Sequence, residues 1–237
     1  MGCLGVHLAS ERWMDVDSAL LRRISVRAFK PDPLSRTLLR EILEVSRFAP
    51  SGGNVQPWKV IAVSGSARDT VSDKAKARLA DGANEVGDKP IYPANLWSPY
   101  RDRRHKMAED MYELLGISRD DRPSRLAHVA RNYDFFGAPV GLFLVIDRRM
   151  GHGQWAHLGM LMQSIALAAV SRGVSSCMQE AWAHVRDTLH AHFKLPAQEM
   201  IYCGMALGYA DESAPVNSIR SDRAPLEEIV TFQGFDG

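Results

Sequence analysis

The chain has 237 residues, 46% of them hydrophobic and 24% charged, and its formal net charge is +1 at pH 7. This composition is that of an ordinary globular protein with ample material for a core. The near-neutral charge provides no general attraction to nucleic acid or to an anionic membrane, so we expect neither as a partner.

The amino-terminal region gives no evidence of export. Residues 1–15 lack the basic start and apolar core of a secretory signal. The three cysteines, Cys3, Cys177 and Cys203, lie far apart and form no CxxC pair, which fits a reduced protein. We therefore expect a cytoplasmic protein with residues 1–19 as an N-terminal extension and with Cys177 and Cys203 buried.

Arg23, Ser25 and Arg27 occupy alternate positions along the chain. In an extended backbone, side chains two residues apart lie on the same face. Two guanidiniums beside a hydroxyl make a good anion site, because an arginine can bind phosphate oxygens with two parallel hydrogen bonds. Taken alone, the triplet is more commonly the solvated face of an edge strand.

Apolar residues at helical spacing predict a helix from about Ser35 that ends at Pro50. The loop that follows combines two prolines and two glycines with the polar side chains of Ser51, Asn54 and Gln56. Glycine reaches backbone conformations closed to other residues, and the polar groups offer donors and acceptors. Such a loop can lie against a flat polar ligand or form an ordinary capped turn.

The rest of the chain follows an apolar pattern that alternates strands with helices. It predicts strands at 59–63, 138–146 and 200–207 and helices at 67–79 and 155–170. The helix at 155–170 is apolar on nearly every side, so we expect burial nearly all round, and its length is too short to cross a bilayer. The tail from Asp211 has few core residues, so we expect it to pack on something else.

Residues 90–132 are strongly basic in two clusters that flank a helical stretch. One interpretation is a solvated helical hairpin. The other is a lid over a bound ligand, in which an arginine such as Arg104 receives a carboxylate or a phosphate. In that case Tyr100, Tyr133 and Phe136 would offer aromatic surface on which a flat substrate stacks.

Several common motifs are missing from the sequence. No GxGxxG follows a strand, which argues against a Rossmann dinucleotide site. The histidines lack HExxH spacing and no GxSxG elbow is present, which argues against a zinc site and a serine hydrolase. We therefore expect no metal.

Four ordered segments together resemble the FMN-dependent nitroreductase family. That family carries an Arg-x-Ser-x-Arg/Lys motif followed by Pro-Ser-x-x-Asn-x-Gln-Pro-Trp, then a segment beneath the flavin ring and a closing LGYxD and RxPLEE pattern. The matching residues are 23–27, 50–58, 173–182, 207–211 and 223–228. The likeness is weakest between residues 65 and 132.

The resemblance implies an α+β fold with a central mixed sheet flanked by helices. It implies one FMN-binding domain over residues 20–237, with 90–132 as a helical lid, and an intertwined homodimer whose sites take residues from both chains. FMN would be the bound cofactor and NADPH or NADH the transient reductant. The flavin carries the chemistry in such proteins, so we expect no catalytic side chain.

The resemblance also implies which basic residues contact the cofactor. Ser25 and Arg223 would hold the phosphate, as the matching family positions do. A fixed cation stabilises the reduced flavin anion, and our hypothesis assigns this role to Arg27 with Arg23 assisting. Many relatives have a second basic residue where this chain has Ile24. That change would weaken phosphate binding by roughly 1–3 kcal/mol unless Arg22 or Arg220 compensates.

The remaining contacts implied by the resemblance come from two other segments. The loop would reach the flavin of the partner subunit through Pro50, Ser51, Gly52 and Asn54. Near the flavin N5 atom, the ring would meet Met178, Gln179 and Glu180. Glu180 has an alternative role as the cap of a helix that begins at Ala181.

A family member of this kind reduces nitroaromatic compounds by two-electron steps through the flavin. The same site could instead reduce a quinone or an activated alkene, or dehalogenate a phenol. A flavin-binding protein without turnover is an alternative from another class. The sequence does not identify the physiological substrate or the preferred nicotinamide.

Overall fold

The computed structural model of the protein describes residues 14–87 and 90–235. Residues 1–13 of the expected N-terminal extension, Cys3 among them, therefore lie outside the described residues. The helices and strands follow one another along the chain in this order: α1 (Val16–Arg22), α2 (Arg36–Ser46), η1 (Gly52–Asn54), β1 (Trp58–Ser64), α3 (Gly65–Ala80), α4 (Tyr100–Leu114), α5 (Arg122–Ala130), η2 (Arg131–Gly137), β2 (Val140–Asp147), α6 (His152–Val170), β3 (Ser175–Gln179), η3 (Glu180–Val185), α7 (Arg186–His192), β4 (Glu199–Gly208), η4 (Pro215–Ser218) and α8 (Leu226–Ile229).

The strands form one sheet in the order β1-β2-β4-β3, and every neighbouring pair of these strands is antiparallel. Within the described ranges, the only parallel pairing is an isolated bridge between Ser25 and Ser176, the second residue of β3. The prediction of an α+β fold is confirmed. The mixed character expected of the sheet is limited to that bridge.

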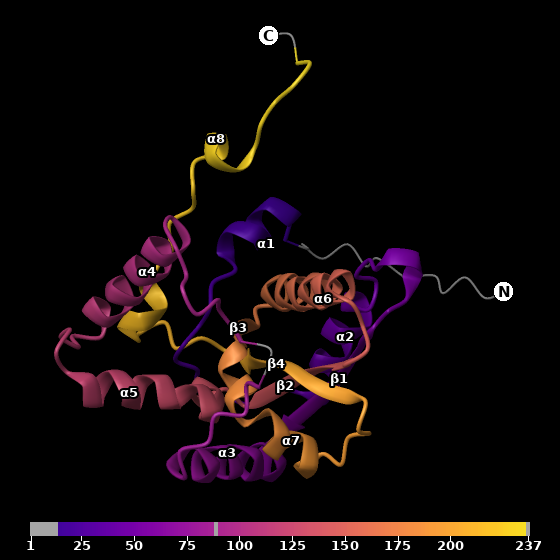
Figure 1. Cartoon of the computed structure of the whole chain (residues 1–237), viewed down its shortest axis with the longest axis vertical. Helices are drawn as coiled ribbons and strands as arrows, with labels where there is room; N and C mark the ends of the chain where they lie inside the picture. The colour runs from indigo at the N-terminus through magenta and orange to yellow at the C-terminus, as the bar shows by residue number, and fades with distance from the viewer. Residues whose placement is uncertain (1–13, 88–89, 236–237) are drawn as a thin grey trace.

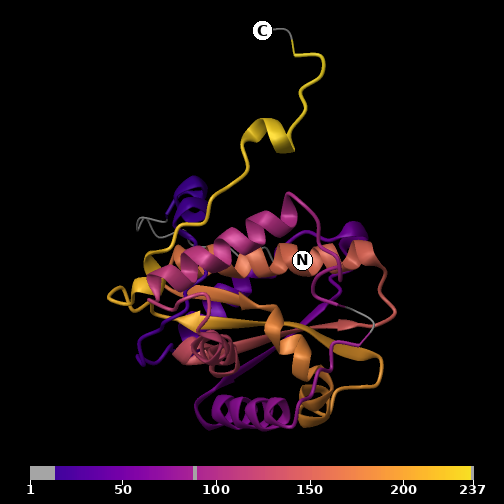
Figure 2. The same ribbon diagram turned by 60° about the vertical axis from the view of Figure 1, so that its left-hand side comes forward.

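Helices cover both faces of the sheet, and alternate residues of β2 face the two layers. Leu142 and Leu144 belong to the core between the sheet and helices α2 and α6. Phe143 and Val145 belong to the core on the opposite face, which α3, α7, η2 and η3 cover. Figures 1 and 2 show α6 and α2 on one side of the sheet and α3 and α7 on the other.

The predicted elements agree with the structure in kind. Ser35 caps α2, since its hydroxyl accepts a hydrogen bond of 3.1 Å from the backbone N–H of Leu38. The basic region contains the expected pair of helices, α4 and α5, and a two-pronged ion pair between Arg125 and Glu109 joins them at 2.7 and 3.0 Å. Cys177 and Cys203 are both buried, as predicted.

Helix α6 is less buried than its sequence suggests. Leu158, Leu161 and Ile165 face the core, but Gly159 and Met160 are exposed in the single chain. The expectation of burial nearly all round is therefore wrong for one chain, which leaves a strip of small and apolar residues on the surface of this helix.

His128 on α5 is buried, and its Nε2 atom has no hydrogen-bond partner among the described residues. Its ring lies beside those of Tyr112 and Phe136, with centroid distances of 6.1 and 6.0 Å. Burial lowers the pKa of His128 to about 4, and the positive charges of Arg131 and Arg27 contribute in the same direction. The folded protein therefore holds this imidazole in its neutral form.

This histidine makes stability depend on pH. Since its pKa in the unfolded chain is about 6.5, the unfolded state takes up a proton between pH 6.5 and 4 that the folded state does not. The free energy of unfolding should fall by about 2 kcal/mol from pH 7 to pH 5 through this group alone. Urea denaturation at pH 7 and pH 5 measures this change. The free energy of unfolding should fall less in His128→Phe than in the unaltered protein, and an equal fall in both proteins would show that His128 is not the cause.

Candidate functional site

A cavity of about 420 Å³ lies between α1, the segment that follows it, and the chain after β4. It gathers four of the residues predicted to contact the cofactor: Ser25 and Arg223, expected at the phosphate, and Arg23 and Arg27, expected to stabilise the reduced flavin. The other lining residues are Leu20, Leu21, Ile24, Met107, Ile219, Arg220 and Ser221. We call this space the four-arginine cavity, after Arg23, Arg27, Arg220 and Arg223.

The backbone beside β3 positions the first half of this cavity. Helix α1 ends at Arg22, and the chain then runs extended along β3, where the N–H of Val26 donates to the Ser176 carbonyl at 3.0 Å. Val26 is buried, while its neighbours Ser25 and Arg27 line the cavity. The alternation expected from the sequence therefore holds across Ser25, Val26 and Arg27, whereas Ile24 also lines the cavity.

Asn217 joins the two halves of the cavity wall. Its side-chain oxygen accepts a hydrogen bond of 2.8 Å from the backbone N–H of Arg27, and its side-chain nitrogen donates to the carbonyls of Ala28 and Asp211 at 2.7 and 2.8 Å. The residue is buried, so the chain before Arg220 is fixed to the chain around Arg27. Asn217 was not predicted from the sequence, because a single asparagine in a short turn carries no signal of its own.

The cavity holds positive charge without acidic neighbours. Among the described residues, none of the four arginines makes an ion pair within 4.0 Å, and the hydrogen bonds of Arg27, Arg220 and Arg223 go to neutral acceptors. Examples are Arg27 to the Ser25 carbonyl at 3.2 Å and Arg223 to the Ser221 hydroxyl at 2.7 Å. Burial lowers the pKa of Arg23, and the positive charge of Arg223 lowers it further. An anion in the cavity would relieve this repulsion.

Strand β3 leads away from the cavity to the second predicted contact region. Ser176 lies beside Ser25 at one end, and Gln179 lies about 10 Å further along the strand, from its rise per residue. The amide of Gln179 is buried and occupied, since it donates to the Asn132 carbonyl at 2.8 Å and accepts from the Trp182 indole at 3.3 Å. A ligand at this end would therefore meet the backbone of Gln179.

Glu180 follows at the end of β3 and lines a small cavity of about 160 Å³ with Pro90, Ile91, Trp155 and Tyr202. Burial of its carboxyl group raises the pKa of Glu180. Glu180 is itself the first residue of the 3-10 helix η3. Glu180 therefore does not cap a helix that begins at Ala181, and its carboxyl group is available to this cavity. Met178, two residues before it on β3, is half-buried.

The loop of residues 50–56 is held in a defined shape on helix α6. The Ser51 hydroxyl accepts a 2.9 Å hydrogen bond from the backbone N–H of Gln56, and the N–H of Gly52 donates to His157 Nε2 at 3.3 Å. The side chains of Asn54 and Gln56 are exposed. None of Pro50, Ser51, Gly52 and Asn54 lines the four-arginine cavity, so a single chain does not unite the two motifs.

The four predicted substrate residues divide into two pairs. Tyr100 and Arg104 are exposed on α4. Tyr133 and Phe136 are buried in the core, and the Tyr133 hydroxyl donates to the Ala181 carbonyl at 3.0 Å. The expectation that these two rings offer surface for stacking is wrong, because η2 turns them inward.

The described ranges contain no group of three or more His, Cys, Asp or Glu side chains that could hold a metal ion. Within residues 14–87 and 90–235, no helix has the length and apolar character needed to cross a membrane.

Comparison with known proteins points to one family. The model for the nitroreductase family matches residues 20–209. The chain is 38% identical to a 4-nitrobenzoate reductase of Pseudomonas putida over 94% of this chain and 97% of that protein. It is 34% identical to a nitrobenzene nitroreductase of Ectopseudomonas oleovorans over 92% of this chain and 96% of that protein.

Solved structures agree in fold. The FMN- and NADPH-dependent nitroreductase NfnB from Sphigopyxis sp. strain HMH superposes with a TM-score of 0.90 at 43% identity, covering 94% of this chain and all of that one. The FMN-dependent nitroreductase NfnB from Mycobacterium smegmatis, in complex with NADPH, gives 0.87 at 29% identity and covers 92% of this chain and 97% of that one.

Proposed function

The chain belongs to the nitroreductase family, and from this premise we propose that it is an FMN-dependent oxidoreductase that uses NADPH or NADH to reduce nitroaromatic compounds. The observation that carries the proposal is the four-arginine cavity. Its arginines have no acidic partner among the described residues, and this donor set fits a phosphate dianion.

The protein's own residues bind and orient the cofactor. Arg23, Ser25 and Arg223 would hold the phosphate, and the backbone at the end of β3 together with Glu180 would contact the flavin. Arg27 provides positive charge where the reduced flavin becomes negative. Ile24 lines the cavity without contributing charge, and Arg220 supplies the further cation. When bound, FMN would accept a hydride from the nicotinamide and pass electrons to the nitro group.

Two solved relatives are described as NADPH-dependent or as an NADPH complex, which supports NADPH as the reductant. Product analysis tests the reaction class. With NADPH and nitrobenzene, the protein should form nitroso and hydroxylamine products. Turnover of quinones or activated alkenes without nitro reduction would favour the alternative on the same fold.

The functional unit is a homodimer in this proposal. Phe48, at the end of α2, is 75% exposed, and Gly159 and Met160 leave a small, apolar strip open on α6. Exposed apolar residues on two helices that pack against each other, as α2 and α6 do, are typical of an interface. A second copy covering it would bring the loop of residues 50–56, which lies on α6, toward the partner's flavin.

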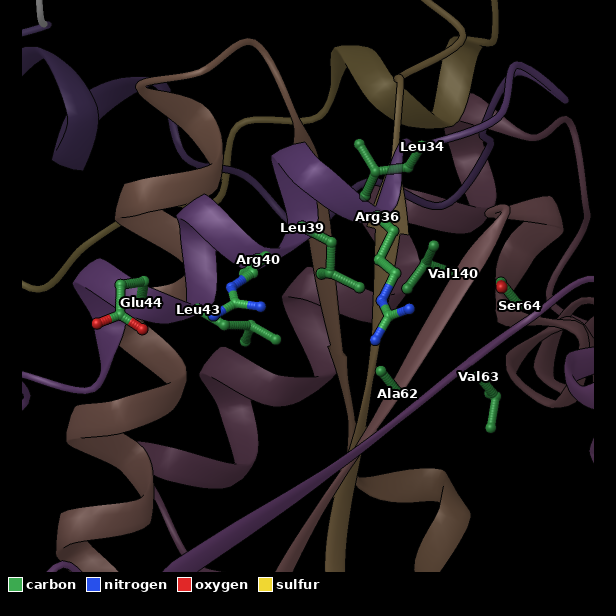
Figure 3. A pocket seen from close by; sticks show the side chains of 10 residues that line it. All are labelled: Leu34, Arg36, Leu39, Arg40, Leu43, Glu44, Ala62, Val63, Ser64 and Val140. Carbon is green, nitrogen blue, oxygen red and sulfur yellow. The ribbon is translucent and has the colours of Figure 1, made fainter.

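The carboxy-terminal tail supports the same arrangement. Figures 1 and 2 show it extending away from the body of the chain, and its apolar residues Ile229, Phe232 and Phe235 are exposed. A groove of about 600 Å³ runs between α2 and the sheet-edge strand β1. Figure 3 shows its lining, with Arg36 extending from α2 toward Ala62. The partner's tail occupies this groove beside the open edge of β1.

Removal of residues 225–237 should therefore convert the dimer into a monomer. The apolar residues of the tail are exposed in a single chain, and they become buried only in the groove of the partner. Sedimentation velocity measures the change, with removal of residues 1–13 as a control of equal length. A dimer that survives loss of the tail would contradict the role of the groove.

A further inference from the structure

One cation at the start of α4 differs from its neighbours. The neighbouring cations have acidic partners: Arg101 with Asp102, Arg103 with Glu228, and Lys106 with Asp110 and Asp222. Arg104 is exposed and, in the part of the chain that the structure describes, has no acidic partner. Its charge is therefore free to receive an anion.

The Arg104 guanidinium is held by an aromatic ring. Its Cζ atom lies 4.3 Å from the centroid of the Tyr92 ring. A guanidinium stacked in this way keeps its N–H groups at its edge, where they match the two oxygens of a carboxylate. Trp97 and Tyr100, whose centroids are 5.6 Å apart, add exposed aromatic surface in the same segment.

The stacked pair is close along the chain to residues that line both cavities of the candidate flavin site. Tyr92 directly follows Ile91, which lines the small cavity together with Glu180. Met107, one helical turn after Arg104 on α4, lines the four-arginine cavity. Both views place α4 on the same side of the sheet as α1 and α6 (Figures 1 and 2).

We propose that Arg104, held against Tyr92, binds the carboxylate of the substrate, so that the enzyme prefers nitroaromatic compounds that carry a carboxylate over neutral ones. This inference rests on the proposed function. A substrate carboxylate fits better than a phosphate of the reductant, because the exposed rings beside the guanidinium match a flat aromatic acid.

The first test measures binding without turnover. Calorimetric titration of the purified protein with benzoate and with benzamide compares an anionic and a neutral ring of similar shape. We expect the unaltered protein to bind benzoate roughly tenfold more tightly than benzamide. This preference should disappear in Arg104→Gln and remain in the control variant Arg101→Gln. Because Arg104 is exposed, the preference should also weaken with added salt. Equal binding of both compounds by the unaltered protein would overturn the proposal.

The second test measures selectivity. In Arg104→Gln, the ratio of kcat/KM for 4-nitrobenzoate to that for nitrobenzene should fall roughly tenfold, while the KM for NADPH stays unchanged. An unchanged ratio would overturn the proposal while leaving the proposed function intact. A raised KM for NADPH would instead assign Arg104 to the reductant. Failure of the unaltered enzyme to reduce either compound would refute the proposed function, and the benzoate titration would still decide the role of Arg104.

Discussion

Replacement of Arg23 by alanine should weaken FMN binding by roughly 10- to 150-fold and leave the FMN-free protein at least as stable as before. A hydrogen bond between charged groups contributes about 1.5–3 kcal/mol, which corresponds to this range of affinity. Arg23 lies in the four-arginine cavity, where burial and the charge of Arg223 both disfavour its cationic form. Without an anion, removal of this charge relieves repulsion.

Titration by quenching of flavin fluorescence measures the affinity, and riboflavin, which lacks the phosphate, distinguishes the cause. The preference for FMN over riboflavin should collapse in Arg23→Ala. Arg22→Ala is the matched control, because Arg22 is exposed and does not line the cavity. Equal weakening of FMN and riboflavin would mean that Arg23 supports the fold and does not bind the phosphate.

Replacement of Gly204 by valine should destabilise the protein by about 3 kcal/mol or more. A Cβ atom at Gly204 in β4 would lie 2.1 Å from Cδ1 of Trp182. The indole cannot move aside, because it is fully buried and packs against Phe135 and Phe143 at centroid distances of 4.6 and 5.0 Å. Overpacking at such a contact forces strain on both elements.

Thermal and urea unfolding of the purified variant measure this loss of stability. A severe loss would appear as a poor yield of soluble protein. Gly153→Ala on α6 serves as the control, because a Cβ atom there meets nothing within 4 Å. That control should unfold at the same or a slightly higher denaturant concentration. If Gly204→Val were as stable as the parent protein, the Trp182 indole would have to move aside to make room for the added side chain.

Periodicity predicted the parts of the fold in which burial alone decides the conformation. The strand at β2 and the helix at α6 follow from long apolar runs, and Ser35 marks the start of α2. Strand β3 was not foreseen as a strand. Its sequence, Ser-Ser-Cys-Met-Gln, is polar at its start, and its place in the sheet depends on pairing with β4 far along the chain.

The misjudged aromatic residues show where local patterns fail. Phe136 and Tyr133 stand in a polar stretch that resembles an exposed loop. The backbone of η2 adopts positive φ at Phe135 and Phe136, both 55°, which turns this segment into the core. Positive φ is unfavourable for bulky side chains, and here the packing of Phe135 on Trp182 compensates for it. Such tertiary compensation has no counterpart in the local sequence.

The sequence predicted the charged residues of the candidate site but not the residues that position them. Arg23, Ser25, Arg27 and Arg223 came from motifs and do line one cavity. Asn217 escaped notice, because its importance lies in hydrogen bonds to residues about 190 positions away. The loop around Asn54 lies apart from the cavity within one chain, so its proposed role depends on a second subunit.

Whether the chain is an FMN-dependent nitroreductase is decided by an anaerobic absorbance spectrum of the protein with FMN, recorded before and after NADPH and again after a nitroaromatic compound. We expect a bound flavin whose visible band bleaches with NADPH and returns on addition of 4-nitrobenzoate. A flavin that stays bound and oxidised under NADPH, or a protein that binds no flavin, would contradict the proposed function.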